Sequence, residues 1–168
     1  CDNLKYLFDE YVKREILDSV IMYENNQGQN ILNVAIRKHC DDDVFNCLLD
    51  LIRNDAEKFL ILLLKKDIYG NTLFDLSIRF RQPTKMKAIF EEFTKLGVVD
   101  DIIMNKDYLE QNILHFTAQT FCSDKAFTCL VNLIKNDAVK FKTLLLKRNV
   151  HGDTPFDVSI IYRQLTKM

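Results

Sequence analysis

The sequence predicts an all-α fold, a helical repeat solenoid with repeats of about 41 residues arranged as an 82-residue duplication. The first observation is an ungapped alignment of Gln29 to Met86 with Gln111 to Met168, which has 31 identities in 58 positions. The second is a helical period in the apolar residues. The third is the presence of only four glycines and two prolines, so flexible linkers are absent and the boundaries we expect are repeat boundaries.

Each 82-residue unit divides further into two halves of about 42 and 40 residues. Gly28 and Gly70 each precede a similar helical phrase, and Glu110 and Gly152 do the same in the second unit. We therefore expect one array over residues 1–168. It comprises a partial repeat at 1–23, repeats at 24–66, 67–106 and 107–148, and a partial repeat at 149–168. A single repeat cannot bury its apolar face alone and needs neighbours to do so.

Apolar stripes with the helical spacing support helices throughout, and no alternating pattern long enough for a strand is present. One stripe runs from Val44 to Ile52, with acidic residues before it, and another runs from Met86 to Leu96, with Gly97 as a C-terminal stop. Shorter stripes predict an extra helical turn in each unit. They comprise Ile16, Leu17, Val20 and Ile21 in the first unit and Val98, Val99, Ile102 and Ile103 in the second.

Composition argues against several classes of function. The 23 basic and 24 acidic residues give a net charge of -1, which provides no field to attract nucleic acid or a membrane surface. The longest apolar runs, such as Phe59 to Leu64, are far shorter than a membrane span, and the first residues do not resemble a signal peptide. Five cysteines, an odd number, favour a reducing, cytoplasmic location. The absence of an initial Met suggests a fragment of a longer array.

The phrase that opens each half resembles the ankyrin repeat, whose turn with Asp and Gly is followed by Thr-Pro-Leu-His-x-Ala. The second and fourth copies are Asp67, Gly70, Thr72, Leu73, Phe74, Asp75, Leu76, Ser77 and Gly152, Asp153, Thr154, Pro155, Phe156, Asp157, Val158, Ser159. The first and third are Asn30, Ile31, Leu32, Asn33, Val34, Ala35 and Asn112, Ile113, Leu114, His115, Phe116, Thr117, Ala118. The resemblance identifies the chain as a divergent ankyrin-repeat array and implies a structural hydrogen bond from His115 to the neighbouring repeat.

Three departures from the ankyrin pattern keep an armadillo-like or HEAT-like solenoid open as an alternative. The period exceeds the usual 33 residues. The glycine between the paired helices is missing. Residues 55–64 and their copy at 137–146 add helical residues.

Neither a metal site nor a catalytic site is expected. His39, His115 and His151 are the only histidines, and no partner falls at zinc-finger spacing from His39. Cys40 and Cys47 recur as Cys122 and Cys129, a pattern that favours small core residues. No nucleophile elbow or phosphate-binding loop is present. We therefore expect no enzyme activity, no cofactor and no metal.

The function that we expect is to bind another protein through a concave face made by turn tips and inner helices. The turn-tip candidates are Gln27, Gln29, Tyr69, Asn71, Leu109, Gln111, His151 and Asp153. The inner-helix candidates are Arg37, Lys38, Arg79, Phe80, Gln119, Thr120, Ile161 and Tyr162. A second hypothesis is a structural spacer that self-associates end to end, because both ends of the chain are cut at the same phase of the repeat.

Overall fold

The chain folds as helices and the segments that join them. The computed structural model describes residues 2–119 and 124–165, and within these ranges it contains twelve α-helices and no strand. The first six are α1 (Asp2–Lys13), α2 (Leu17–Ile21), α3 (Ile31–Arg37), α4 (Asp42–Ile52), α5 (Ala56–Leu64) and α6 (Leu73–Arg79). The others are α7 (Pro83–Leu96), α8 (Val99–Ile103), α9 (Ile113–Gln119), α10 (Asp124–Ile134), α11 (Ala138–Leu146) and α12 (Pro155–Leu165). For these residues the predicted all-α class is confirmed.

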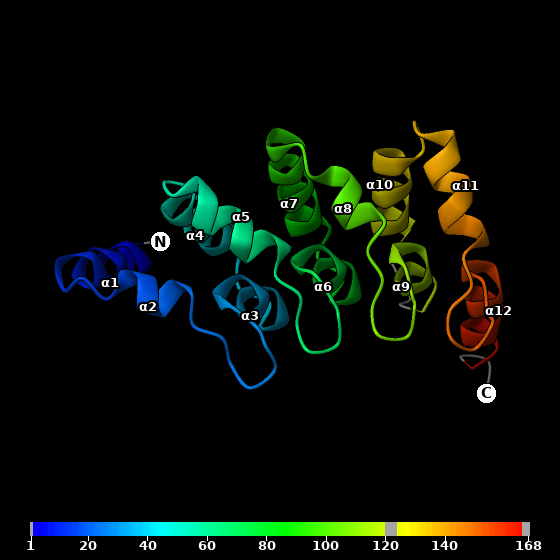
Figure 1. The fold of residues 1–168 in the computed structure, drawn as a ribbon, viewed down its shortest axis with the longest axis horizontal. Helices are drawn as coiled ribbons and strands as arrows, with labels where there is room; N and C mark the ends of the chain where they lie inside the picture. Colours follow the sequence, from blue (N-terminus) through cyan, green and yellow to red (C-terminus); the bar gives the residue numbers. More distant parts are fainter. Residues whose placement is uncertain (1, 120–123, 166–168) are drawn as a thin grey trace.

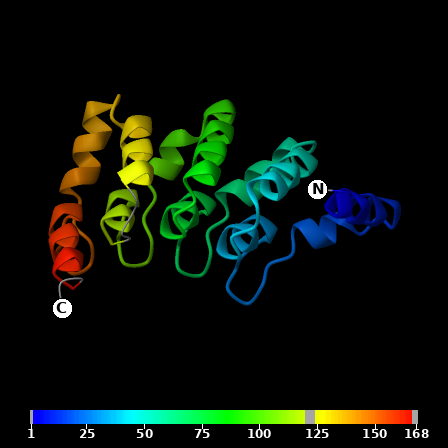
Figure 2. The same ribbon diagram turned by 180° about the vertical axis from the view of Figure 1, so that it is seen from behind.

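The helices stand side by side in an elongated molecule, with α1 at one end and α12 at the other (Figures 1 and 2). One layer consists of α3, α6, α9 and α12, each in contact with the next. A second layer contains α4, α7 and α10, in which α7 contacts both of its neighbours. The loops that lead into the first layer all emerge along one edge, the lower edge in Figure 1.

The core lies between the two layers. Phe45, Phe74, Phe93 and Phe116 are among its largest fully buried side chains. The ring of Phe74 in α6 lies 6.2 Å from the ring of Phe93 in α7, in an edge-to-face arrangement, and 6.0 Å from the ring of Phe90. Aromatic pairs at this separation stabilise a fold beyond the burial of their area. Phe74 therefore fastens the first layer to the second.

Helix ends follow the local chemistry of the sequence. α7 begins at Pro83, whose fixed φ suits a first helical turn, and ends before Gly97, which caps it at a φ of 72°. α6 begins with a capping box, in which Thr72 and Asp75 each accept a hydrogen bond from the backbone of the other. α4 and α7 lie on the predicted apolar stripes, and α2 and α8 occupy the predicted extra turns.

The same buried contact recurs at the offset of the duplication. The side-chain amide of Asn30 donates to the backbone carbonyl of Leu62 over 2.8 Å, and that of Asn112 donates to the carbonyl of Leu144 over the same distance. In both units the bond ties the start of a first-layer helix to the C-terminal turn of the following α5 or α11. Equal sequence therefore produces equal long-range contacts.

The turn between the paired helices keeps a left-handed residue although its glycine is missing. His39 follows α3 with a φ of 53°, and Arg81 follows α6 with a φ of 56°. Non-glycine residues adopt this conformation at a cost of roughly 1 kcal/mol. The turn geometry is thus maintained by the packing around it and does not require glycine.

Candidate protein-binding surface

Four turns of one design lead into the first layer. In each, an Asp or Asn side-chain oxygen accepts hydrogen bonds from the backbone N–H groups two and four residues later, as an Asx turn does. The oxygen of Asp67, for example, accepts from the N–H groups of Tyr69 and Asn71, both over 2.9 Å. The corresponding residues in the other turns are Asn25, Asp107 and Asn149. The sequence thus fixes the shape of each turn locally.

Successive turns are also joined to one another by backbone hydrogen bonds. The N–H of Tyr108 donates to the carbonyl of Tyr69 over 3.0 Å. The equivalent bonds run from Ile68 to Gln27 over 3.1 Å and from Val150 to Leu109 over 3.0 Å. The four turns therefore form one continuous ladder along the lower edge of the molecule in Figure 1.

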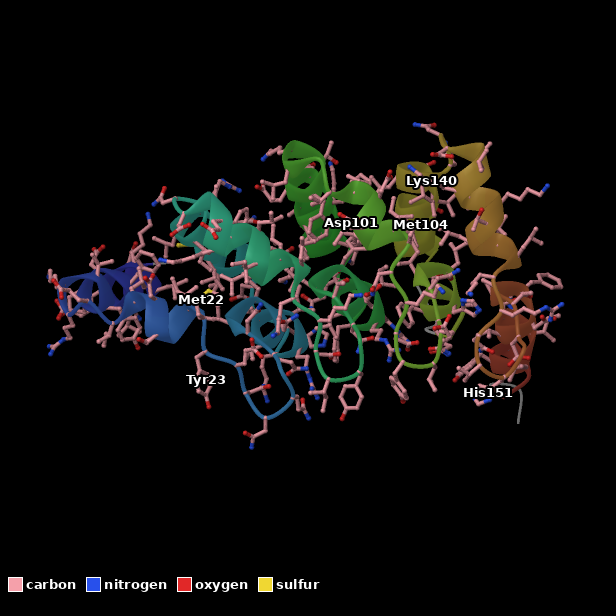
Figure 3. All side chains as sticks on the ribbon, viewed as in Figure 1. Met22, Tyr23, Asp101, Met104, Lys140 and His151 are labelled. Carbon is pink, nitrogen blue, oxygen red and sulfur yellow. The ribbon has the colours of Figure 1, made fainter. Side chains whose placement is uncertain are left out.

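Apolar and aromatic side chains project from the tips of this ladder. We call the tip residues of the last three turns the turn ridge: Ile68, Tyr69, Tyr108, Leu109, Val150 and His151. Ile68 is 62% exposed and Tyr108 is 63% exposed, and the rings of Tyr69 and Tyr108 lie 6.0 Å apart. Figure 3 shows His151 on this edge. Five of the six ridge residues are exposed and Leu109 is half-buried, and all lie on a backbone held by hydrogen bonds.

Three of the predicted tip residues do not belong to the exposed surface, and this corrects the expectation from sequence. Gln29, Asn71 and Gln111 are each only 3% exposed. They end their turns, directly before the first-layer helices, and the side chains of Asn71 and Gln29 bond back to the side chains of Asp67 and Asn25 over 3.0 and 3.2 Å. Gln27 and Leu109 are half-buried, whereas Tyr69 and His151 are exposed.

Sequence reasoning missed Ile68, Tyr108 and Val150, which are among the most exposed apolar residues of the ridge. Each follows directly on the Asp or Asn that nucleates its turn. That position is the signal that could have identified them, because the residue after the Asx residue lies at the tip of the turn.

The two arginines among the inner-helix candidates, Arg37 and Arg79, end α3 and α6 and already have partners. Arg37 contacts the Gln27 side chain and lies 5.9 Å from the centre of the Phe80 ring. Arg79 lies 2.9 Å from the carboxylate of Asp107 and 4.3 Å from the centre of the Phe116 ring. These arginines therefore join neighbouring helices and turns.

The other inner-helix candidates differ in exposure. Lys38 and Ile161 are exposed, whereas Gln119 and Tyr162 are half-buried. Thr120 lies outside the described residues. Asp153, a tip candidate, is half-buried. As contacts for a partner, the members of this set that are exposed or half-buried stay predictions.

His115 is fully buried and makes an interhelical hydrogen bond. Its Nε2 lies 3.1 Å from the backbone carbonyl oxygen of Asp153, and its Nδ1 lies 2.8 Å from the side-chain oxygen of Asn112 and 3.2 Å from the backbone nitrogen of Asn112. Burial lowers the pKa of His115, which favours the neutral form of the ring. The bond reaches the turn before α12, as the ankyrin resemblance implies.

Asp75 stands at the same place in α6 and is also fully buried. One of its oxygens accepts from the N–H of Thr72 over 2.8 Å, from the Thr72 hydroxyl over 2.7 Å and from the Asn105 side chain over 2.7 Å. Burial raises the pKa of Asp75 from 3.8 to about 6, while these hydrogen bonds act to lower it. Asp75 therefore joins α6 to the segment that follows α8.

Among the described residues, no group of three or more His, Cys, Asp or Glu converges on a point where a metal ion could bind. His39 instead lies 5.9 Å from the Phe80 ring. Within the same residues, no helix is both long and apolar enough to span a membrane.

The cysteines differ among themselves. Cys40 is a half-buried free thiol whose pKa is raised by burial. Cys47 is buried in the core and disulfide-bonded. This bond was not expected, and it weakens the inference of a reducing location. Cys122 and the side chain of Cys129 lie outside the described part of the chain.

Two hollows lie away from the turns. An apolar one of about 270 Å³ is lined by Phe8, Leu17 and Ile52, among others, between α1, α2 and α4. A wide, open one of about 610 Å³ is lined by Lys140 and Asp101, among others (Figure 3). The wall of the second hollow contains both lysines and acidic residues, so it does not favour a ligand of either charge.

Compared with known families and with characterised proteins, the sequence matches no family model and no characterised protein at a significant level.

Proposed function

We propose that this protein is an ankyrin-like repeat protein that binds another protein through its turn ridge and the adjacent ends of the first-layer helices. The observation that carries the proposal is the row of exposed apolar side chains on the hydrogen-bonded ladder of turns. Apolar and aromatic groups are the usual anchors of protein interfaces, and tyrosine is among the commonest hot-spot residues. A rigid backbone also lowers the entropy lost on binding.

The ladder favours an ankyrin-like repeat over the armadillo-like and HEAT-like alternatives. Ankyrin repeats combine a β-turn with two helices, whereas the alternatives are built from helices alone. The nucleating residues of the turns, Asn25, Asp67, Asp107 and Asn149, stand at or next to the first residue of each predicted repeat. The short helices α2, α5, α8 and α11 then account for the long period as additions to this unit.

The chemistry of the ridge indicates the kind of partner. Ile68, Tyr108 and Val150 offer apolar area without a cluster of like charge, which suits a protein segment with exposed apolar side chains. Charged polymers would gain little, because the net charge of the chain is only -1.

The test is to select binders from a displayed library of natural protein fragments and to measure their affinity for variants by interferometry. We expect Ile68→Ala and Tyr108→Ala each to weaken binding by roughly tenfold or more, since hot-spot truncations commonly cost above about 1.4 kcal/mol. Both side chains are exposed, so circular dichroism and thermal unfolding should stay unchanged. Arg79→Ala is a poor probe, because Arg79 holds Asp107.

The matched control is Val139→Ala. Val139 is 77% exposed but lies at the start of α11, away from the turns. Its loss should leave affinity unchanged. Binders that tolerate both ridge variants but lose affinity to changes elsewhere would contradict the proposal.

A further inference from the structure

Each of the three turns that form the turn ridge has an exposed cation directly before the Asp or Asn that nucleates it. These cations are Lys66, Lys106 and Arg148. In the first turn, Glu24 stands at this position, and the tip residues Asn26 and Gln27 are polar. The cations and the apolar tips therefore occur in the same three turns.

These cations lie beside the ridge. Lys66 and Lys106 both line the wide hollow next to α8, which places them on the same side of the turns. The guanidinium of Arg148 donates to the backbone carbonyl of Gly152, which follows the tip residue His151. A partner that covers the apolar tips therefore also meets these cations.

The acidic residues that nucleate two of these turns are not accessible to a partner. Asp67 and Asp107 are buried, and an oxygen of each accepts backbone N–H groups of its own turn. Asp107 also lies 2.9 Å from the guanidinium of Arg79. In the fourth turn the only carboxylate, that of Asp153, is half-buried. These carboxylates therefore leave the exposed cations uncovered.

The exposed carboxylate of the third turn is shared. Glu110 lies 2.9 Å from the Nζ of Lys106 and 3.4 Å from that of Lys147, so one carboxylate serves two lysines. Within the described part of the chain, neither Lys66 nor Arg148 forms an ion pair. The charged groups that a partner can contact beside the ridge are therefore mainly cations, and two of them are free to pair with it.

We propose that the partner of the turn ridge is a protein segment in which acidic residues flank apolar ones. Its apolar side chains pack on the ridge, and its carboxylates pair with Lys66 and Arg148. This inference rests on the proposed binding function of the ridge and names the chemistry of the partner. Complementary charges of this kind contribute to partner choice and association rate more than to affinity. The cations thus determine which apolar segments bind.

An anionic membrane surface offers the same two kinds of contact, but the outline of the molecule argues against it. A flat surface needs the turns to end at one level. In Figures 1 and 2 the loop that leads into α3 extends beyond the loops that lead into α6 and α9. That loop carries Glu24 and polar tip residues, so it holds a flat anionic surface away from the ridge. A protein segment can instead follow the three apolar turns alone.

The first test selects binders from the displayed library of natural protein fragments on two forms of the full chain in parallel. One form is the wild type and the other is the double variant Lys66→Glu with Arg148→Glu. The wild type should enrich fragments with Asp and Glu next to apolar residues, and the double variant should enrich fragments with Lys and Arg there. Both replaced side chains are exposed, so circular dichroism should show the variant folded. Fragments of the same charge from the two selections would overturn the inference.

Affinity measurements on the fragments selected by the wild type provide the second test. K66E and R148E should each weaken binding by roughly fivefold, because an exposed ion pair is lost and like charges meet. This loss should shrink when NaCl is raised from about 0.05 M to about 0.5 M, since salt screens exposed charges. Lys142→Glu is the matched control, because Lys142 is an exposed cation of α11, away from the turns, and its reversal should leave affinity unchanged.

The outcomes separate this inference from the function on which it rests. Fragments that lose affinity to Ile68→Ala but tolerate K66E and R148E would overturn the acidic partner and leave the binding function of the ridge in place. Fragments that tolerate all three changes would contradict the binding function itself. Co-sedimentation with vesicles of phosphatidylcholine and phosphatidylserine in equal parts is the last measurement. The wild type should stay in solution, and vesicle binding that K66E and R148E abolish would overturn the choice of a protein segment.

Discussion

Asp75 and Asp157 hold the same position in the two copies of the duplicated unit, yet Asp75 is fully buried and Asp157 only half-buried. Each carboxylate accepts from a threonine hydroxyl over 2.7 Å and caps its helix in the same way. Burial raises the pKa of Asp75 to about 6, whereas the hydrogen bonds from Thr154 lower the pKa of half-buried Asp157. The difference teaches that local sequence makes the cap, while the next part of the chain, through Asn105, determines the burial.

The largest difference between the units is expected at the preceding residue. Phe74→Ala should lower the free energy of unfolding by about 3–5 kcal/mol, because it leaves a cavity beside two aromatic rings. Phe156→Ala should change it by less than about 0.5 kcal/mol, since Phe156 is exposed. Urea denaturation at low protein concentration measures both. Equal losses would mean that Phe156 is covered within the monomer.

The second difference concerns pH. The pKa of Asp75 is about 6 in the folded state and about 3.8 in the unfolded chain. Protonation of Asp75 therefore stabilises the fold fully below about pH 4, and this stabilisation is lost as the pH rises to about 6. The change is on the order of 3 kcal/mol. Urea denaturation across this range should therefore show wild type losing stability relative to Asp75→Asn as pH rises. Asn33 occupies the same place in α3, so asparagine fits there.

Asp157→Asn provides the matched comparison for this pH effect. The pKa of Asp157 is lowered, so its contribution is present above the unfolded pKa and is lost as pH falls. The wild type should therefore lose stability relative to D157N toward acid, which is the opposite slope. If the stability of the wild type relative to each variant changed with pH in the same direction, Asp75 would not be buried in solution.

Much of the fold could be predicted from sequence because it depends on local features. The apolar period located α4 and α7, Gly97 marked the end of α7, and the short stripes located α2 and α8. These features act within one or two helical turns, so the residues themselves carry the information.

The surface could be predicted less well because it depends on turn register and on neighbours. Tyr69 and Asn71 both donate a backbone N–H to Asp67, yet the side chain of Tyr69 is exposed while that of Asn71 turns inward and donates to the Asp67 carboxylate. The engagement of Arg79 likewise depends on Asp107, 28 residues later in the chain. Such pairings are not encoded in the period of the repeat.

The smallest predicted difference concerns left-handed residues that are glycine in only one unit. Glu15 has a φ of 57° where Gly97 has 72°, and Glu110 has 57° where Gly28 has 66°. Glu15→Gly should raise the free energy of unfolding by about 0.5 kcal/mol, because relief of backbone strain exceeds the entropy that glycine adds to the unfolded chain.

Glu110→Gly should gain less than Glu15→Gly, and thermal unfolding of the two variants side by side measures the difference. Glu110 lies 2.9 Å from the Nζ of Lys106 and 3.4 Å from that of Lys147, and these contacts lower its pKa. At the equivalent places the first unit has Glu24 and Lys65, which pair directly over 2.7 Å. In the second unit Lys106 stands in place of this glutamate, so Glu110 is the carboxylate that pairs with both Lys106 and Lys147. An equal or larger gain for Glu110→Gly would show that these ion pairs add nothing to stability.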